Sequence, residues 1–241
     1  MFTNNVKRRK RGRPAGPTAQ GEAAKQRLYA TAIRMIGERG YEQTTLREIA
    51  READVSVGLL YRYFPSKRAV ILALYEELTS GYAGKAADMK PGRWRDRFMF
   101  ALETSLAVLQ PHRIALRALT PVLVGDPHDG VFAAGTAFSR ARVQHVFEEA
   151  VSGASDAPSP QLAAALGRLL YLAHLAVLLW WLLDRSGRQR ATTGLVALTK
   201  QLLPSTALAI RLPPVRRFVI GIDQLMGEGL FEECIARTRR R

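Results

Sequence analysis

Apolar residues recur at helical spacing along most of the chain, and this pattern predicts a bundle of helices. In the first such segment, from Glu22 to Arg39, the positions Leu28, Ala32 and Ile36 fall four apart and form one apolar face. No segment shows the strict alternation of apolar and polar residues that a half-buried strand requires. The pattern therefore predicts an all-α fold.

The segment from Thr44 to Val70 predicts two short helices joined by a tight turn and followed directly by another helix. The first short helix begins at Thr45, with Glu48 at the spacing of a capping box. Asp54 lies in the turn, where a short polar side chain tolerates a left-handed backbone, and Ser56 can cap the second short helix. This is the pattern of a helix-turn-helix, whose second helix enters the major groove of DNA.

The second short helix is expected over Val57 to Phe64, with a further helix over 67–82. Leu60 and Phe64 are four residues apart and are expected to point inward. The outer side is then left to Val57, Gly58, Leu59, Tyr61, Arg62 and Tyr63.

From Pro91 onward, long apolar helical patterns alternate with breaks rich in proline and glycine. The expected organisation is an arm over 1–21, a DNA-binding domain over 22–83 and a larger helical domain over 91–241. In the larger domain, helices are expected near 92–110, 112–124, 130–151, 160–186, 189–203 and 213–238.

The net charge of +15, from 36 Lys and Arg against 21 Asp and Glu, favours a polyanionic partner, either nucleic acid or an anionic membrane surface. Residues 1–21 hold a cluster of basic residues and no acid before Glu22, which is typical of a flexible basic arm. Cys234 is the single cysteine, so an intramolecular disulfide is impossible and a reducing compartment is compatible. The start of the chain shows no secretory signal.

The apolar run from Leu169 to Leu183 raises the question of a membrane span. It is shorter than the ~20 residues that a span needs, contains His174 and follows Arg168. We interpret it as a buried helix at an interface and expect no membrane partner.

Within the basic arm, Arg11, Gly12 and Arg13 precede a proline in a pattern that resembles an AT-hook. Such an Arg-Gly-Arg segment lies in a narrow A·T-rich minor groove, whose negative potential attracts arginine. The alternative is a polybasic tail that adds affinity for any DNA through counterion release.

The helix-turn-helix segment resembles the TetR family of bacterial transcriptional regulators. The matching motifs are GYEQTT at Gly40–Thr45, LREIA at Leu46–Ala50, ADVS at Ala53–Ser56, GLLYRYF at Gly58–Phe64 and SKRA at Ser66–Ala69. Beyond this segment only the helical pattern and the overall length agree with the family.

Two positions depart from the family pattern. Asp54 stands where glycine is usual, and Leu59 stands where threonine or a similar polar residue is usual. Leu59 can offer only an apolar contact, for example to a thymine methyl group.

The resemblance implies a cytoplasmic homodimer that binds a palindromic operator on double-stranded DNA and responds to a small-molecule effector. It implies phosphate contacts by Thr45, Tyr63 and Lys67, and base-edge or backbone contacts by Tyr61 and Arg62. The full set of expected DNA-binding residues is Arg11, Gly12, Arg13, Thr44, Thr45, Ser56, Val57, Gly58, Leu59, Tyr61, Arg62, Tyr63 and Lys67.

The resemblance also implies an effector pocket among the later helices, lined by apolar side chains with a few polar groups. The apolar content indicates a hydrophobic or amphipathic effector, although a stripe of aromatic residues at helical spacing is more often core or dimer seam. The expected ligand-binding residues are Trp94, Phe98, Leu102, His112, Phe138, Arg142, His145, Tyr171, His174 and Trp181.

The helices near 160–186 and 189–203 are the expected dimer interface, because the family pairs its last long helices as a four-helix bundle. The first is apolar on several faces, which a lone surface helix would not tolerate. The expected seam consists of Leu162, Leu166, Leu169, Leu170, Ala173, Ala176, Val177 and Trp180.

The sequence carries no pattern of an enzyme, and we expect no catalytic residues, no cofactor and no metal. The four histidines form no H-E-x-x-H or Cys/His pattern, and no nucleophile elbow, P-loop or dinucleotide fingerprint appears. Asp126, His128 and Asp129 offer metal ligands, but GDPHDG is more simply a loop that breaks a helix.

The function that these observations favour is a ligand-responsive TetR-type repressor. Two alternatives stay open from the sequence. One is an architectural or activating DNA-binding protein that needs no effector. The other is a helical small-molecule-binding protein or enzyme with a vestigial DNA-binding head.

Overall fold

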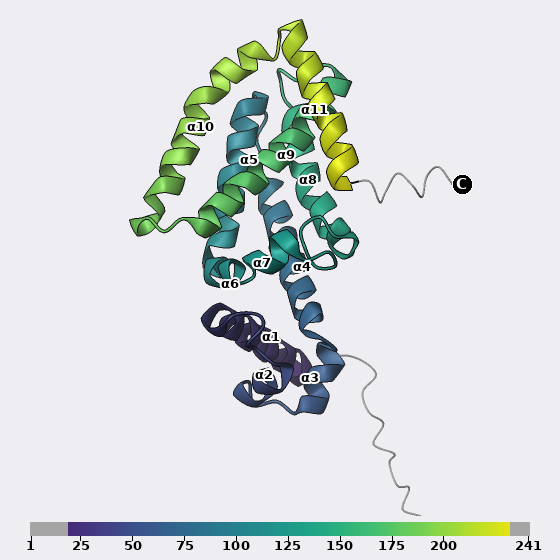
Figure 1. Ribbon diagram of the computed structural model, residues 1–241, viewed down its shortest axis with the longest axis vertical. Helices are drawn as coiled ribbons and strands as arrows, with labels where there is room; N and C mark the ends of the chain where they lie inside the picture. The colour runs from purple at the N-terminus through teal and green to yellow at the C-terminus, as the bar shows by residue number, and fades with distance from the viewer. Residues whose placement is uncertain (1–18, 232–241) are drawn as a thin grey trace, which may run out of the picture.

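The computed structural model describes residues 19–231, which are helical and contain no strand, as the apolar pattern predicts. A small head at one end comprises α1 (Ala19–Arg39), α2 (Leu46–Glu52) and α3 (Val57–Tyr63), below a larger helical body (Figure 1). The helix α4 (Lys67–Ala86) runs from the head into the body.

The head has a core of its own. Leu28 and Met35 of α1 pack with Ile49 of α2 and Leu60 of α3, and none of these side chains is more than 1% exposed. Gly40 ends α1 with φ at +92°, a backbone conformation that favours glycine. The short helices α2 and α3 are therefore held by side-chain burial against α1.

The body consists of helices that follow one another through short connections, with α8 and α9 packed along each other and α11 on α9 (Figure 1). Its helices are α5 (Trp94–Leu109), α6 (Arg113–Ala118), α7 (Thr120–Gly125), α8 (Ala137–Ser152), α9 (Pro160–Leu183), α10 (Arg190–Ala209) and α11 (Pro213–Phe231).

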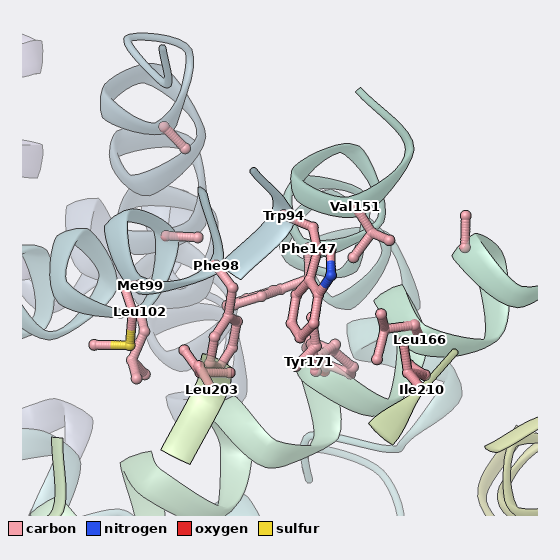
Figure 2. Close-up of a cluster of buried hydrophobic side chains, with 14 of the residues drawn as sticks. Trp94, Phe98, Met99, Leu102, Phe147, Val151, Leu166, Tyr171, Leu203 and Ile210 are labelled. Carbon is pink, nitrogen blue, oxygen red and sulfur yellow. The ribbon is translucent and has the colours of Figure 1, made fainter. Parts of the chain in front are cut away.

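Aromatic side chains from three helices fill the centre of the body (Figure 2). Phe98 of α5 and Tyr171 of α9 both pack on the buried ring of Phe147 of α8, with ring centroids 6.0 and 6.3 Å away. Leu203 of α10 and Ile210 cover the same cluster.

The helix α4 contributes to every hydrophobic cluster in the described chain. Val70 packs in the head, Leu74 in the cluster beside α6 and α7, and Tyr82 in the aromatic core. The helix continues to Ala86, past the end expected at residue 82. A domain boundary near 83–91 stays a prediction, because α4 belongs to the cores on both sides.

The helices expected over 112–124 and 130–151 have different bounds in the structure. The first is divided into α6 and α7 near Pro121, whose ring cannot donate a backbone hydrogen bond. The second begins later, at Ala137, because the side chain of Asp126 accepts 2.8 Å hydrogen bonds from the backbone N–H groups of His128 and Asp129 and holds a turn there.

The last two helices also differ from the expected bounds. The helix expected over 189–203 runs on to Ala209, with the exposed Pro204 inside it. The helix expected over 213–238 is α11, which the structure describes as far as Phe231.

The helix α9 has 24 residues, so its length and composition alone would allow it to cross a membrane. In the structure it packs in the body, with Leu166, Tyr171 and Trp181 buried. Arg168 is paired with Asp223 of α11, with Nε 2.7 Å from Oδ1. These contacts match a core helix that also contributes to the surface.

Candidate functional site

The helix α3 presents one face to the core and the opposite face to solvent. Leu60 is fully buried, whereas Val57 and Tyr61 are 41% and 45% exposed and Arg62 is also exposed. The N-terminus of the helix is capped by Ser56, whose Oγ accepts a hydrogen bond of 3.2 Å from the N–H of Leu59. The result is a short, anchored helix whose outer side chains can contact a partner.

The turn before α3 has the geometry that the sequence predicts. Asp54 adopts a left-handed conformation with φ at +51°. The N–H of Val55 donates to the carbonyl of Ala50 across 3.0 Å, which fixes the direction in which the chain enters α3.

A capping box starts α2, as the sequence predicts. The N–H of Thr45 donates to Glu48 Oε2 across 3.0 Å, and the N–H of Glu48 donates to Thr45 Oγ1 across 3.3 Å. The hydroxyl of Thr45 also donates to the same carboxylate across 2.7 Å, and these bonds lower the pKa of Glu48. This hydroxyl, expected to hold a phosphate, is therefore already paired within the chain, and the phosphate contact stays a prediction.

The side chain of Thr44 is fully buried, and its hydroxyl donates to the carbonyl of Gly40 across 2.8 Å. The prediction that the side chain of Thr44 contacts DNA is therefore wrong. The residue instead closes the turn between α1 and α2.

Lys67, expected to hold a phosphate, already has a partner inside the chain. Its Nζ donates to the carbonyl of Tyr41 across 2.9 Å and lies 4.3 Å from the centre of the Tyr41 ring. An ammonium group has three donors, so a phosphate contact remains compatible with this pairing. The half-buried Tyr63 lies in a shallow hollow with Leu59 and Arg62. Arg11, Gly12 and Arg13 lie outside the described residues.

The body contains a cavity of about 290 Å³. Its wall is almost wholly apolar and comes from α4 to α9 and from the loop between α7 and α8. Tyr75 and Tyr82 of α4 are part of this wall, so the helix that leaves the DNA-binding head also encloses the cavity. The phenol of Tyr82 donates to the carbonyl of Ala101 across 3.2 Å.

A buried histidine is part of the cavity wall. The Nε2 atom of His174 lies 2.7 Å from the hydroxyl of Ser105, and its ring centroid is 4.7 Å from that of Phe147. Burial lowers the pKa of His174 to about 3, so the imidazole is neutral near pH 7.

The predicted ligand-binding residues divide into three groups. Tyr171, His174 and Trp181, which share one face of α9, line the cavity. The predicted roles of Trp94, Phe98 and Leu102 are not supported, because these residues lie in the aromatic core (Figure 2). None of them belongs to the cavity wall.

The other predicted ligand-binding residues lie outside the cavity wall. His112 belongs to a 3₁₀ turn, and Phe138 and His145 are exposed. Arg142 pairs with Glu76 of α4 across 2.9 Å. Phe138, Arg142 and His145 share one face of α8, as their spacing predicts, but Phe138 and His145 are exposed and Arg142 is paired with α4.

Part of the predicted dimer seam is buried within the chain itself. Leu162, Leu166 and Leu170 are at most 9% exposed and pack in the aromatic core, so they are not available to a partner. Leu169 and Val177 are half-buried. Ala173, Ala176 and Trp180 are exposed on α9.

An ion pair joins the first turn of α4 to the loop between α7 and α8. Arg68 Nε is paired with the carboxylate of Asp129, and Arg68 Nη2 donates to the carbonyl of His128 across 3.2 Å. The phenol of Tyr75 donates to the carbonyl of Asp129 across 3.1 Å. The same loop supplies Val131 to the cavity wall.

The possible metal ligands in this loop have other partners. Asp126 accepts backbone hydrogen bonds, which lower its pKa, and Asp129 pairs with Arg68. Over residues 19–231, no group of three His, Cys, Asp or Glu side chains is placed to hold a metal ion.

Comparisons with known proteins agree with this geometry. The family described as bacterial regulatory proteins, tetR family, matches residues 28–74, which cover most of α1, all of α2 and α3 and the start of α4. The repressor KstR of Mycolicibacterium smegmatis is 50% identical over 52 residues, 22% of this chain and 25% of that protein. The regulator YuxN of Bacillus subtilis is 43% identical over 47 residues, 20% of this chain and 16% of that protein. The chain thus covers a quarter or less of the length of these two relatives.

Solved structures extend the likeness of fold to the body. A tetR-family regulator from Streptomyces coelicolor superposes with a TM-score of 0.57 at 20% identity, covering 90% of this chain and 96% of that one. The regulator FadR from Bacillus subtilis, solved with stearoyl-CoA, gives 0.56 at 14% identity and covers 74% of this chain and 96% of that one. The helix-turn-helix segment, over residues 28–74, thus matches the tetR family, and the body shares the fold of these solved structures.

Proposed function

We propose that this chain is a transcriptional regulator that binds a palindromic operator as a homodimer and is released by a small hydrophobic or amphipathic ligand. The observation that carries the proposal is α3, whose inner face is anchored by Leu60 and whose outer face exposes Val57, Tyr61 and Arg62. The major groove of B-DNA admits an α-helix of this kind.

The outer residues of α3 suit DNA in different ways. Arg62 can form two hydrogen bonds to a guanine edge, which is worth about 1–3 kcal/mol of discrimination against another base. Nothing lies within 4 Å of a Cβ built on Gly58, so the helix surface is open there for close approach to the groove. The net charge of +15 favours the approach of a polyanion. We assign phosphate contacts to Tyr63 and to the remaining donors of Lys67.

A homodimer is supported by the apolar side chains that the body exposes. Trp180 and Leu183 of α9 are 50% and 55% exposed, and Leu198 and Leu202 of α10 are 57% and 64% exposed. Monomeric proteins rarely leave so many large apolar side chains on neighbouring elements in water. Two copies joined through this surface would present two α3 helices related by two-fold symmetry, which matches a palindromic DNA site.

The cavity supports the ligand-responsive part of the proposal. Because α4 supplies cavity residues and also follows α3 directly, a ligand that changes the position of α4 changes the spacing of the two reading helices. The ligand must bind the released state more tightly than the DNA-bound state for this to happen. The KstR relatives are repressors, which supports repression here, and FadR was solved with stearoyl-CoA, which supports an amphipathic ligand.

The proposed site of action is the cytoplasm, where the DNA of a bacterium lies. The relatives that match the helix-turn-helix are regulators, which supports a regulatory rather than a catalytic role.

The test is a selection of bound duplexes from a random pool, with purified full-length protein at physiological salt, followed by footprinting of the best site. The proposal predicts a short palindrome whose half-sites lie one helical turn apart, about 10 base pairs. Uniform recovery of duplexes without a common site would contradict specific regulation and favour a protein that coats DNA.

A further inference from the structure

The polar groups of the cavity wall are mostly paired with the chain itself. The phenol of Tyr75 donates to the carbonyl of Asp129, Thr79 donates to the carbonyl of Tyr75 across 2.7 Å, and Thr120 donates to the carbonyl of Leu116 across 3.3 Å. Such groups have little left to offer a ligand.

His174 is different from these groups. Its Nε2 atom is paired with the hydroxyl of Ser105 at 2.7 Å, but its Nδ1 atom is buried and has no hydrogen-bond partner. A buried polar atom without a partner is rare in folded proteins and is costly, since it has lost its bonds to water. The residue lines the cavity, and a bound molecule would supply the missing partner once a small movement of the ring exposes Nδ1, which has less than 1 Å² of accessible surface.

The surroundings of His174 keep its ring neutral. The ring centroid of His174 lies 6.4 Å from that of Tyr82 and 6.3 Å from that of Tyr171. The ring of Phe147 is closer, with its centroid 4.7 Å away. Burial raises the pKa of both tyrosines, so neither supplies a charge near pH 7. A neutral ring gives one donor and one acceptor, and which of these faces the ligand depends on the tautomer.

A hydroxyl group satisfies Nδ1 in either tautomer, because it can both donate and accept. A carboxylate can only accept, and burying its charge beside the neutral ring of His174 is strongly unfavourable. Arg140 also lines the cavity, but its Nη1 atom already donates to the carbonyls of Val131 and Ala133 across 3.1 Å. The chemistry at this point therefore selects an uncharged group.

The volume of the cavity limits the rest of the ligand. An engineered apolar cavity of about 150 Å³ holds benzene, so about 290 Å³ corresponds to roughly twice that ligand, or about twelve non-hydrogen atoms. The apolar wall matches a hydrocarbon body of this size.

We propose that the cavity binds an uncharged amphiphile of medium size whose single hydroxyl group hydrogen-bonds to Nδ1 of His174, while Ser105 holds the other side of the ring. This inference rests on the proposed function only in treating the cavity as the effector site. It deepens that function by naming the chemical class of the ligand and the residue that recognises its polar group.

The experiment is calorimetric titration of the full-length protein with octan-1-ol and decan-1-ol, and with octanoate and decanoate as charged partners of equal chain length. We expect the alcohols to bind at least about tenfold more tightly than the carboxylates. Tighter binding of the carboxylates, or no binding of either alcohol, overturns the proposal.

Variants test the role of His174 directly. His174→Phe keeps an aromatic ring without the nitrogen atoms and should weaken decan-1-ol binding about fivefold to tenfold. His174→Gln keeps a hydrogen-bonding side chain and should restore part of the affinity. Thr199→Val removes a hydroxyl of α10 that is paired within its helix and lies outside the cavity wall, and should leave the affinity unchanged. Circular dichroism verifies that each variant is folded.

Equal loss of affinity in His174→Phe, His174→Gln and Thr199→Val would show a general loss of packing and contradict recognition by His174. DNA release is measured separately, by fluorescence anisotropy of a bound operator duplex. Alcohol binding that depends on His174 without any DNA release would support this inference and contradict the proposed effector role. DNA release by a different ligand, with no alcohol binding, would contradict this inference and support the proposed effector role.

Discussion

The guanidinium of Arg68, in the first turn of α4, is paired with the carboxylate of Asp129 in the loop between α7 and α8. These residues are 61 positions apart in the chain, yet the pair joins the end of the DNA-binding head to a loop that forms part of the cavity wall. The cavity and α3 are therefore connected in two ways. One is the ion pair at the N-terminal turn of α4, and the other is the packing of α4 side chains against the cavity.

Removing this connection should loosen the loop more than it destabilises the fold. The side chain of Arg68 is 47% exposed, so Arg68→Ala should cost no more than about 1 kcal/mol of unfolding free energy. Amide exchange over residues 128–136 should rise by roughly fivefold, because the loop loses both the ion pair and the bond to the carbonyl of His128. Hydrogen-exchange mass spectrometry measures this.

The matched control is Arg47→Ala, which removes an exposed arginine of α2. If the loop exchanges equally in both variants, the connection described above does not stabilise it.

The capping box at Thr45 gives a second prediction. Thr45→Ala removes the bond from the N–H of Glu48 and the hydroxyl bond to its carboxylate, and should cost about 1 kcal/mol of unfolding free energy. Thr45→Ser keeps both bonds and should stay close to the parent protein. Urea denaturation monitored by circular dichroism checks both variants. Unchanged stability in Thr45→Ala together with a large loss of DNA affinity would instead favour the phosphate contact first expected for this hydroxyl.

The exposed face of α10 predicts the oligomeric state. Leu198→Glu combined with Leu202→Glu should convert the dimer to a folded 26.7 kDa monomer, since both side chains are exposed in the single chain. Sedimentation velocity measures the change. Phe138→Glu, at an exposed position of α8 outside the proposed interface, should remain dimeric. A parent protein that sediments as a monomer would contradict the proposed interface.

His174 predicts a pH dependence of stability. Its pKa is about 3 in the folded chain, below the usual 6.5, so the unfolded chain binds more protons between these values. The stability from its neutral form is present above pH 6.5 and declines as the pH falls toward 3. Between pH 7 and pH 5 this group should lower the unfolding free energy by about 2 kcal/mol.

The variant His174→Gln should lack this part of the pH dependence, since glutamine does not titrate. Urea denaturation of both proteins at pH 7 and pH 5 isolates the contribution, because their other titrating groups are shared. Parallel pH profiles would mean that the imidazole is already accessible to protons in the folded chain.

The helix-turn-helix could be predicted from the sequence because its signals are local. Thr45 and Glu48, Asp54 and Ser56 each act within a few residues, and the structure places all four in the predicted backbone roles. Thr44 was misplaced because its burial depends on how α1 packs beside it, which no local pattern reports.

The cavity could be predicted only in part, because its walls come from segments that are distant in the chain. Helical spacing indicated that Tyr171, His174 and Trp181 share one face, but spacing cannot say whether a face points inward. For this reason the α8 stripe that includes Phe138 was assigned to the cavity although it is exposed. Tyr75 and Tyr82 were missed because α4 was assigned entirely to the DNA-binding domain.

The most direct test of the central claim measures whether α3 reads DNA sequence. Fluorescence anisotropy would compare the selected operator with an unrelated duplex of equal length, for the parent protein and for Tyr61→Ala combined with Arg62→Ala. Arg93→Ala serves as a control, because it removes an exposed arginine at the start of α5, away from the head. We predict that the double variant loses roughly tenfold to a hundredfold in operator affinity and binds both duplexes almost equally, while the control keeps its preference. A double variant that retains the full preference for the operator would contradict the assignment of α3 as the reading helix.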